Sequence, residues 1–148
     1  MLELREFSPE DLESCVQVFV EVFRQPPWND RWPSFERAQQ YVSDLTGIPG
    51  FRGFLALQGG EIAAFCLGHR RRWWQGDEYY VNEMGVLPAQ QHSGVGSKLI
   101  AFAEERLRQN GMQYVALLTE RDIPAERFWL KQGYRQDRQT IFMFKYLL

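Results

Sequence analysis

The chain has 148 residues, of which 45% are hydrophobic and 24% are charged. This is the size and balance of a globular domain with its own core, and it excludes a disordered or fibrous protein. A formal net charge of -2 and a pI of about 5.7 give no reason to expect binding to the phosphate backbone of nucleic acid. We therefore expect residues 1–148 to form a single domain that binds no nucleic acid.

Residues 1–50 predict one short strand followed by two helices. The strand runs from Leu2 to Phe7, and Ser8 with the proline after it is typical of a helix start. Apolar residues then recur every three or four positions as far as Phe23, and the Pro-Pro pair ends this helix. A second apolar stripe from Ala38 to Leu45 predicts another helix.

Residues 51–87 predict three antiparallel strands, at 51–57, 62–68 and 78–87. The first two are joined by a link that contains two glycines, which is a hairpin signal. The second strand is apolar on both faces, so we expect helices on both faces of the sheet. The stretch from Arg70 to Asp77 predicts a turn, with Arg70, Arg71 and Arg72 either at a solvated hairpin tip or in contact with phosphate.

The remaining residues predict a helix from Val95 to about Asn110 and a buried strand over 113–119. A strand, a helix and a second strand with short links favour a right-handed crossover and a parallel strand pair. Asp122 is then expected to cap a helix over 124–132, and residues 140–148 to form the final strand.

Other features of the sequence indicate a protein without membrane or metal partners. Cys15 and Cys66 lie in apolar stretches with no His or Cys at metal-ligand spacing, so we expect buried thiols and no metal site. No apolar run is long enough to span a membrane, and the N-terminus has no signal-peptide pattern. We expect a cytoplasmic protein.

Two glycines, Gly94 and Gly96, stand where a polar stretch becomes a helix. The first amides of a helix have no helical partner, and they attract anions together with the helix dipole. A dinucleotide fingerprint needs a third glycine where Leu99 stands, and a P-loop needs Gly-Lys-Ser/Thr, which is absent here. Two interpretations stay open: a diphosphate site, and a tight turn that holds nothing.

The pattern Gln91-x-x-Gly94-x-Gly96, preceded by Val86-x-Pro88, resembles the phosphate loop of the GNAT family of N-acetyltransferases. The later segment AERFWLKQGY, residues 125–134, is similar to that family's Ala-x-x-Phe-Tyr-x-x-x-Gly-Phe segment. The resemblance implies an α/β fold with a mixed, mostly antiparallel sheet, one splayed parallel strand pair, and helices on both faces. It also implies transfer of an acetyl group from acetyl-CoA to a primary amine of a small molecule or peptide.

The resemblance further implies which residues hold the cofactor. Met84, Gly85 and Val86 would offer backbone groups to the pantetheine arm. The loop that would hold the pyrophosphate comprises Gln91, His92, Ser93, Gly94, Val95, Gly96 and Ser97.

Glu83 resembles the glutamate that the family carries on this strand, and a carboxylate there would accept the proton of the amine. The alternative is a surface glutamate. Strict alternation along the strand predicts that Glu83 shares a face with Tyr79, Val81 and Gly85.

The family's tyrosine after the late phenylalanine is replaced by Trp129, whose indole is no acid near neutral pH. Tyr134, water or no group at all would then protonate the CoA thiolate, and core packing is the alternative role for Trp129.

The first loop is the candidate for acceptor recognition. Trp28, Asp30 and Trp32 are expected to form an aromatic and acidic mouth for an amine, or else simply to pack. Trp73 and Trp74 would line the opposite wall or form a homodimer contact. Two other functions stay open: a catalytically weak acyl-CoA-binding module, and a structural domain whose glycine turn is empty.

Overall fold

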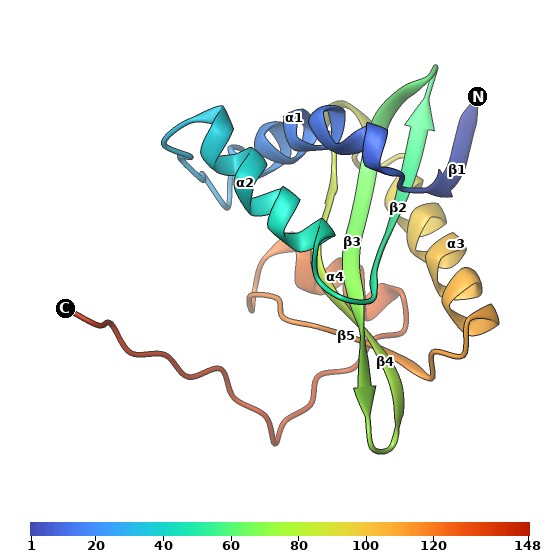
Figure 1. Cartoon of the computed structure of the whole chain (residues 1–148), viewed down its shortest axis with the longest axis vertical. Helices are drawn as coiled ribbons and strands as arrows, with labels where there is room; N and C mark the ends of the chain where they lie inside the picture. The colour runs from blue at the N-terminus through green and yellow to red at the C-terminus, as the bar shows by residue number, and fades with distance from the viewer. The chain divides into compact units, whose positions relative to one another are not determined.

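A computed structural model describes all residues, 1–148, and it separates into two compact units, Met1–Leu118 and Thr119–Leu148. The first unit holds the sheet and three of the four α-helices (Figure 1). Its strands are β1 (Leu2–Glu6), β2 (Phe51–Gln58), β3 (Glu61–Trp73), β4 (Gly76–Val86) and β5 (Tyr114–Leu117). Its helices are α1 (Leu12–Phe23), α2 (Phe35–Thr46) and α3 (Val95–Gln109), with short 3-10 turns at Pro9–Asp11 and Pro88–Gln90.

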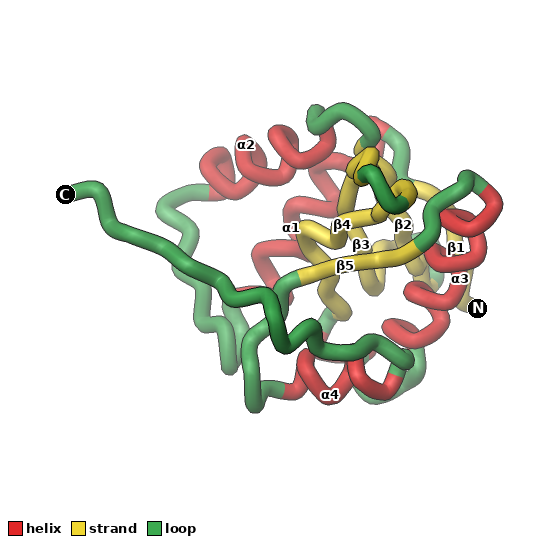
Figure 2. The backbone as a smooth tube through the Cα atoms, turned by 90° about the horizontal axis from the view of Figure 1, so that it is seen from below, coloured by secondary structure: helices red, strands yellow, loops and turns green.

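Helices cover both faces of the sheet, as the sequence predicts from the strand at 62–68, now part of β3, which is apolar on both faces. Figure 2 shows α1 and α2 on one side of the strands and α3 on the other. On the first face, Phe19 of α1 packs against Phe65 of β3 with ring centroids 6.1 Å apart. On the second face, Phe102 of α3 lies 6.2 Å from Phe54 of β2. The sheet is therefore the middle layer of three, with a core on each side.

The strand order is β1-β2-β3-β4-β5, and every neighbouring pair is antiparallel except β4 and β5. The parallel register begins at Glu78 with Tyr114 and ends at Val81 with Leu117. Beyond this point β4 continues to Val86 without a partner on the β5 side. The mixed sheet and its single parallel pair, which separates at one end, match the predicted fold.

A β-bulge in β4 changes which residues share a face. Leu67 of β3 pairs with Glu83, but the next residue, Gly68, pairs with Val81, so Asn82 is an extra residue. Glycine is required at position 68, because a Cβ there would lie 2.4 Å from the carbonyl oxygen of Tyr80. An extra residue reverses the alternation of side chains beyond it.

The consequence is that Glu83 and Tyr79 lie on opposite faces. Tyr79 packs against Phe54 on the α3 side, whereas Glu83 contacts Tyr41 of α2. The prediction that Glu83 shares a face with Tyr79 and Val81 was wrong, because it assumed a regular strand.

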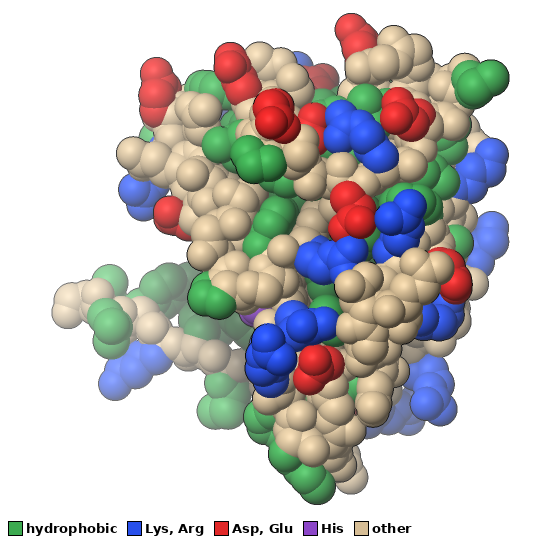
Figure 3. All heavy atoms as spheres, turned by 45° about the vertical axis from the view of Figure 1, so that its right-hand side comes forward, with side chains coloured by type: hydrophobic (Ala, Val, Ile, Leu, Met, Phe, Trp, Pro, Cys, Tyr) green, Lys and Arg blue, Asp and Glu red, His purple; other side chains and the backbone are tan.

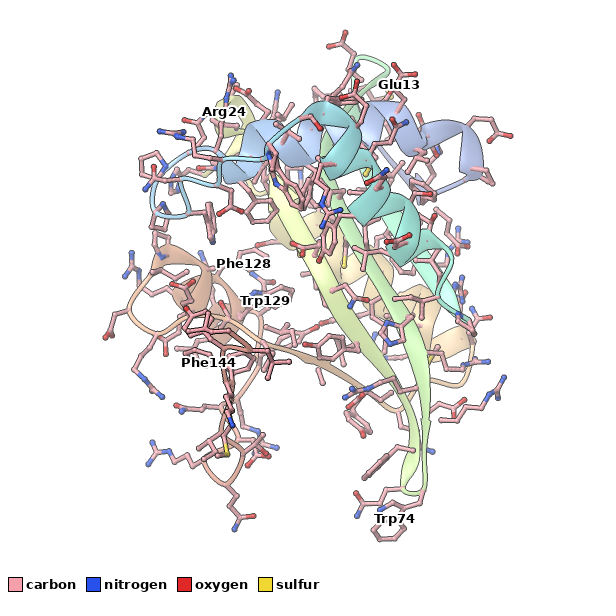
Figure 4. All side chains as sticks on the ribbon, turned by 60° about the vertical axis from the view of Figure 1, so that its left-hand side comes forward. Glu13, Arg24, Trp74, Phe128, Trp129 and Phe144 are labelled. Atoms are coloured by element: carbon pink, nitrogen blue, oxygen red, sulfur yellow. The ribbon has the colours of Figure 1, made fainter.

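The hairpin between β3 and β4 is longer than expected. Arg70, Arg71 and Arg72 belong to β3, so the prediction that they form the hairpin tip was wrong. Arg70 pairs with Asp77 at 3.2 Å and Arg71 with Glu78 across the two strands, which extends the ladder. The tip carries Trp74 instead (Figure 4). On the face seen in Figure 3, both basic and acidic side chains are present, and several basic ones lie near one another.

The second unit contains α4 (Pro124–Lys131) and an extended C-terminal segment. The helix is preceded by Ile123 at the N-cap, so the predicted cap by Asp122 was wrong; the Asp122 amide instead donates to the Glu126 carboxylate at 2.8 Å. The predicted strand over 140–148 is absent, because this unit contains no other strand to pair with. In this C-terminal segment large apolar side chains, including Ile141 and Phe144, are exposed.

Cys15 and Cys66 are buried free thiols, as predicted, and burial raises the pKa of each to about 12. None of the helices combines the length and the apolar character needed to cross a bilayer. No group of three or more His, Cys, Asp and Glu side chains is arranged to hold a metal ion.

Candidate active site

The carboxylate of Glu83 is held by a tyrosine from the helical layer formed by α1 and α2. Tyr41 of α2 donates its hydroxyl hydrogen to Oε2 of Glu83, with the two oxygens 2.5 Å apart. Burial raises the pKa of the Glu83 carboxyl, the Tyr41 hydrogen bond works against that rise, and the nearby charge of Asp30 adds to it. The pKa of Glu83 therefore lies above the ordinary value for a glutamate, which suits a group that must accept a proton.

An aromatic cluster fixes the position of Tyr41. Its ring lies 5.5 Å from Trp32 and 5.8 Å from Phe19, measured between ring centroids. Phe19 is 2% exposed and packs in turn on Phe65 of the central strand. Burial, followed by the bond to Glu83, raises the pKa of the Tyr41 phenol, so it stays protonated and can only donate to the carboxylate.

The loop between α1 and α2 carries the three predicted acceptor residues. Trp32 packs against Tyr41 and Phe19, and its indole Nε1 is buried with no hydrogen-bond partner. Asp30 is exposed and close enough to act on the Glu83 carboxylate. Trp28 packs against Phe23, with ring centroids 5.1 Å apart. The structure thus brings Trp32 and Asp30 near Glu83 and places Trp28 against the core.

The predicted phosphate loop connects the end of β4 to α3. Gly94 is the N-cap of α3 with φ of 86°, and a Cβ there would meet no atom within 4 Å. The backbone angle, and not crowding, therefore favours glycine at this position. The Gln91 side chain donates from Nε2 to the carbonyl of Val86 at 3.0 Å, and the Ser93 hydroxyl donates to the carbonyl of Gln90.

The start of α3 presents backbone donors to one exposed region. Val95, Gly96 and Ser97 form the first turn, whose amides point out of the helix end. Gly96 is buried within this turn, whereas His92 and Gly94 are exposed in the loop before it. This set of amides can bind phosphate oxygens without a lysine or a metal ion.

The end of β4 presents a second set of backbone groups. Met84, Gly85 and Val86 lie beyond the last residue that pairs with β5, so one edge of the strand is open there. A Cβ on Gly85 would lie 2.8 Å from Cγ1 of Val22, so this glycine allows α1 to pack closely on the strand. An open strand edge followed by the amides of a helix start fits an extended ligand that has amide groups at one end and phosphates at the other.

Trp129 and Tyr134 lie together in the C-terminal unit. Their ring centroids are 4.8 Å apart, and the Tyr134 amide donates to the Trp129 carbonyl at 3.0 Å. Trp129 is buried at 8% exposure and also packs on Phe128 of α4 (Figure 4). This packing agrees with the structural role of Trp129, and the role of Tyr134 as a proton donor stays a prediction.

Comparison with protein families gives a match over residues 13–134 to the acetyltransferase (GNAT) family, a range that runs through both compact units. The chain belongs to the GNAT acetyltransferase family. The aminoalkylphosphonate N-acetyltransferase of Salmonella typhimurium is 31% identical to this GNAT protein over 142 residues, covering 90% of this chain and 85% of that enzyme. N-acetyl transfer from acetyl-CoA to an amine is therefore the activity class of this GNAT protein.

Solved structures share its fold. A possible acetyltransferase from Clostridium difficile 630 superposes with a TM-score of 0.83 at 10% identity, over 100% of this chain and 99% of that one. The aminoglycoside N-acetyltransferase AAC(6')-Iy in complex with CoA gives a TM-score of 0.77 at 16% identity, over 98% and 95% of the two chains. These identities show the fold, and they confirm the predicted GNAT architecture.

Tyr41 is the site residue that the sequence did not reveal. It occupies one position of the apolar stripe of α2, where a tyrosine is typical of core packing. The signal that could have revealed Tyr41 is its hydroxyl group. A phenol packed in a core needs a hydrogen-bond partner, and the Glu83 carboxylate is an acceptor for which the sequence suggests no donor.

The raised pKa of Glu83 predicts how Glu83→Gln changes the stability of the fold with pH. Since the pKa is higher in the folded chain than in the unfolded chain, this group's stabilising contribution is complete below its unfolded pKa and is lost as pH rises through the folded pKa. Glutamine does not titrate and still accepts from Tyr41. The variant should therefore match the natural protein in acid and exceed it in free energy of unfolding at neutral pH.

Urea unfolding at a series of pH values measures this difference. Glu13→Gln is the matched control, since Glu13 is exposed on the first turn of α1 and should give the same curve as the natural chain. The difference in free energy of unfolding between Glu83→Gln and the natural protein should rise from acid to neutral pH. If this difference fell instead, the raised pKa of Glu83 would be contradicted.

Proposed function

We propose that this protein transfers the acetyl group of acetyl-CoA directly to the primary amine of a small cytoplasmic molecule, with Glu83 as the general base. Residues 1–148 act as a single N-acetyltransferase domain. The observation that carries the proposal is the position of Glu83: a partly buried carboxylate, anchored at one oxygen by Tyr41, on the part of β4 that runs on beyond β5. The carboxylate and the open strand edge thus lie side by side.

The reaction needs a base because an ammonium group has no lone pair. Glu83 takes the proton of the amine directly or through one water, which frees the lone pair on nitrogen. Acetyl-CoA supplies the thioester: the new N–C bond forms as the C–S bond breaks, and CoA leaves as its thiolate. Tyr134 or a water molecule then gives that thiolate a proton. No covalent bond to the enzyme forms at any stage.

The proposed cofactor contacts are made by backbone groups. The open edge of β4 at Met84, Gly85 and Val86 binds the amides of the pantetheine arm. The amides of the loop and first turn of α3, from Gln91 to Ser97, bind the pyrophosphate. AAC(6')-Iy, which shares the fold, is in complex with CoA, and this supports CoA as the cofactor.

The acceptor is proposed to be a small molecule with a primary amine. Asp30 and Glu83 place two carboxylates near one another, which attracts an ammonium group, and Trp32 borders the same region. The relative at 31% identity is an aminoalkylphosphonate N-acetyltransferase, so aminoalkylphosphonates are the first acceptor class to test. Aminoglycosides are the second, because several enzymes that share the fold act on them.

A panel of amines tests the proposed activity. The protein is mixed with acetyl-CoA and a thiol reagent, and thiol release is followed with aminoalkylphosphonates, aminoglycosides, polyamines and amino acids. We expect release that depends on the amine, and a Glu83→Gln variant slower by about 10² to 10⁴ in turnover, as for loss of a general base. Binding of acetyl-CoA without release for any amine would favour the weak acyl-CoA-binding module. Full turnover by Glu83→Gln in acid would remove Glu83 from the mechanism.

The phosphate loop is tested by Gly96→Glu. A carboxylate in the first turn of α3 adds bulk and negative charge where a phosphate is proposed to lie, so CoA binding should be lost. Ala101→Glu is the control, because it adds the same side chain to an exposed position further along α3 and should leave binding unchanged. Calorimetric titration of both folded variants measures CoA affinity, and equal affinity in the two would contradict the loop assignment.

We also propose that the protein forms a homodimer. Trp74 is 81% exposed at the hairpin tip and Phe144 is 71% exposed in the C-terminal segment, and large exposed apolar side chains often mark interfaces. Sedimentation of the full chain over a range of micromolar concentrations should show a dimer that Trp74→Ser or Phe144→Ser weakens. A monomer at every concentration would contradict this proposal.

A further inference from the structure

The link between Tyr41 and Glu83 joins two layers of the fold. The residues are separated by 42 positions in the sequence, and their hydrogen bond connects α2 to β4. The Tyr41 ring is confined between Trp32 and Phe19, and Phe19 is itself buried against the sheet. The phenol therefore cannot turn away from the carboxylate unless this packing is broken.

A carboxylate held in this way has one oxygen in use and one available. Oε2 of Glu83 accepts the phenol hydrogen, so Oε1 is the oxygen that can meet an incoming proton. We propose that Tyr41 is a positioning residue of the transfer reaction: its hydroxyl fixes one oxygen of Glu83 so that the other faces the acceptor amine. This inference rests on the proposed role of Glu83 as the base.

The same surroundings decide when Glu83 is ionised. Two titratable groups act on it, Tyr41 from α2 and Asp30 from the loop after α1, and on its own strand the phenol of Tyr80 lies close enough to feel the Glu83 charge. The Tyr41 hydrogen bond favours the ionised form, and the Asp30 charge disfavours it. Burial raises the pKa of Tyr80, whose phenol is then uncharged near neutral pH and exerts no charge on Glu83. The remaining acidic side chain from this end of α1, Glu21, forms an ion pair with Arg24.

Two substitutions should therefore shift the acid limb of the pH–activity profile in opposite directions. Tyr41→Phe removes a bond that favours the carboxylate, so the acid limb of kcat/KM should move to higher pH. Asp30→Asn removes a negative charge, so the limb should move to lower pH. Since kcat/KM reports the free enzyme, neither shift depends on how the acceptor binds.

The experiment measures kcat and kcat/KM against pH for the natural protein and the two variants, with the acceptor that the amine panel identifies. For Tyr41→Phe we also expect the plateau of kcat to fall by about ten- to a hundredfold, the rate equivalent of one hydrogen bond to a charged group. A purely structural role for Tyr41 would lower the melting temperature and the active fraction but leave the pH of the limb unchanged.

Tyr80→Phe is the matched control. It removes a phenol from the neighbouring part of β4, next to His69 and Arg71, without touching the bond to Glu83. Its acid limb should coincide with that of the natural protein. An equal shift in Tyr80→Phe and Tyr41→Phe would mean that any lost phenol has this effect, and it would overturn the proposal.

A direct titration keeps the test independent of turnover. Carbon-13 NMR of the glutamate carboxyls, with the Glu83 signal assigned by its loss in Glu83→Gln, follows the ionisation of this group in each folded variant. A Glu83 titration that moves upward in Tyr41→Phe and downward in Asp30→Asn supports the proposal, and one that stays in place overturns it. If Glu83→Gln keeps full activity, the proposed base fails instead, so the two failures are distinguishable.

Discussion

The face on which the Glu83 carboxylate lies depends on one extra residue in β4. Asn82 interrupts the regular ladder with β3, and Gly68 makes the interruption possible because any larger residue would collide with the Tyr80 carbonyl. Before the bulge, Tyr79 packs toward α3; after it, Glu83 faces α2 and meets Tyr41. A strand without the bulge would direct the carboxylate into the opposite layer, where the first loop and its acidic and aromatic residues could not reach it.

The fold holds this carboxylate at a cost in stability. Burial disfavours its ionised form, and the single hydrogen bond from Tyr41 compensates for only part of that effect, so the pKa of Glu83 stays raised. The same condition suits the proposed role of Glu83, because a base with a raised pKa binds the proton of an amine more firmly. The last residue of β4 that pairs with β5 is Val81, so Glu83 already lies on the open part of the strand, which then leads into the amides of α3. The proposed base, the open strand edge and the proposed phosphate loop therefore follow one another within 83–97.

The sequence predicts most of the architecture because its periodic patterns are long. Apolar repeats located α1, α2 and α3, and the doubly apolar stretch of β3 correctly implied helices on both faces. The bulge was missed because alternation gives no sign of an inserted residue, and Tyr41 was missed because its spacing fits a core stripe. The strand over 140–148 was predicted from composition alone, yet a strand also needs a neighbour to pair with, which composition does not supply.

The most direct test of this account is a crystal structure of the slow Glu83→Gln variant with acetyl-CoA and its acceptor both bound. Glutamine keeps the shape of the side chain and its bond from Tyr41, so the complex should assemble without rapid turnover. The acceptor nitrogen should lie on the α1 and α2 face, within hydrogen-bond reach of the side chain at position 83 directly or through one water, and the thioester should lie at the open edge of β4. An acceptor nitrogen on the α3 face, or one with no contact to position 83, would contradict this prediction.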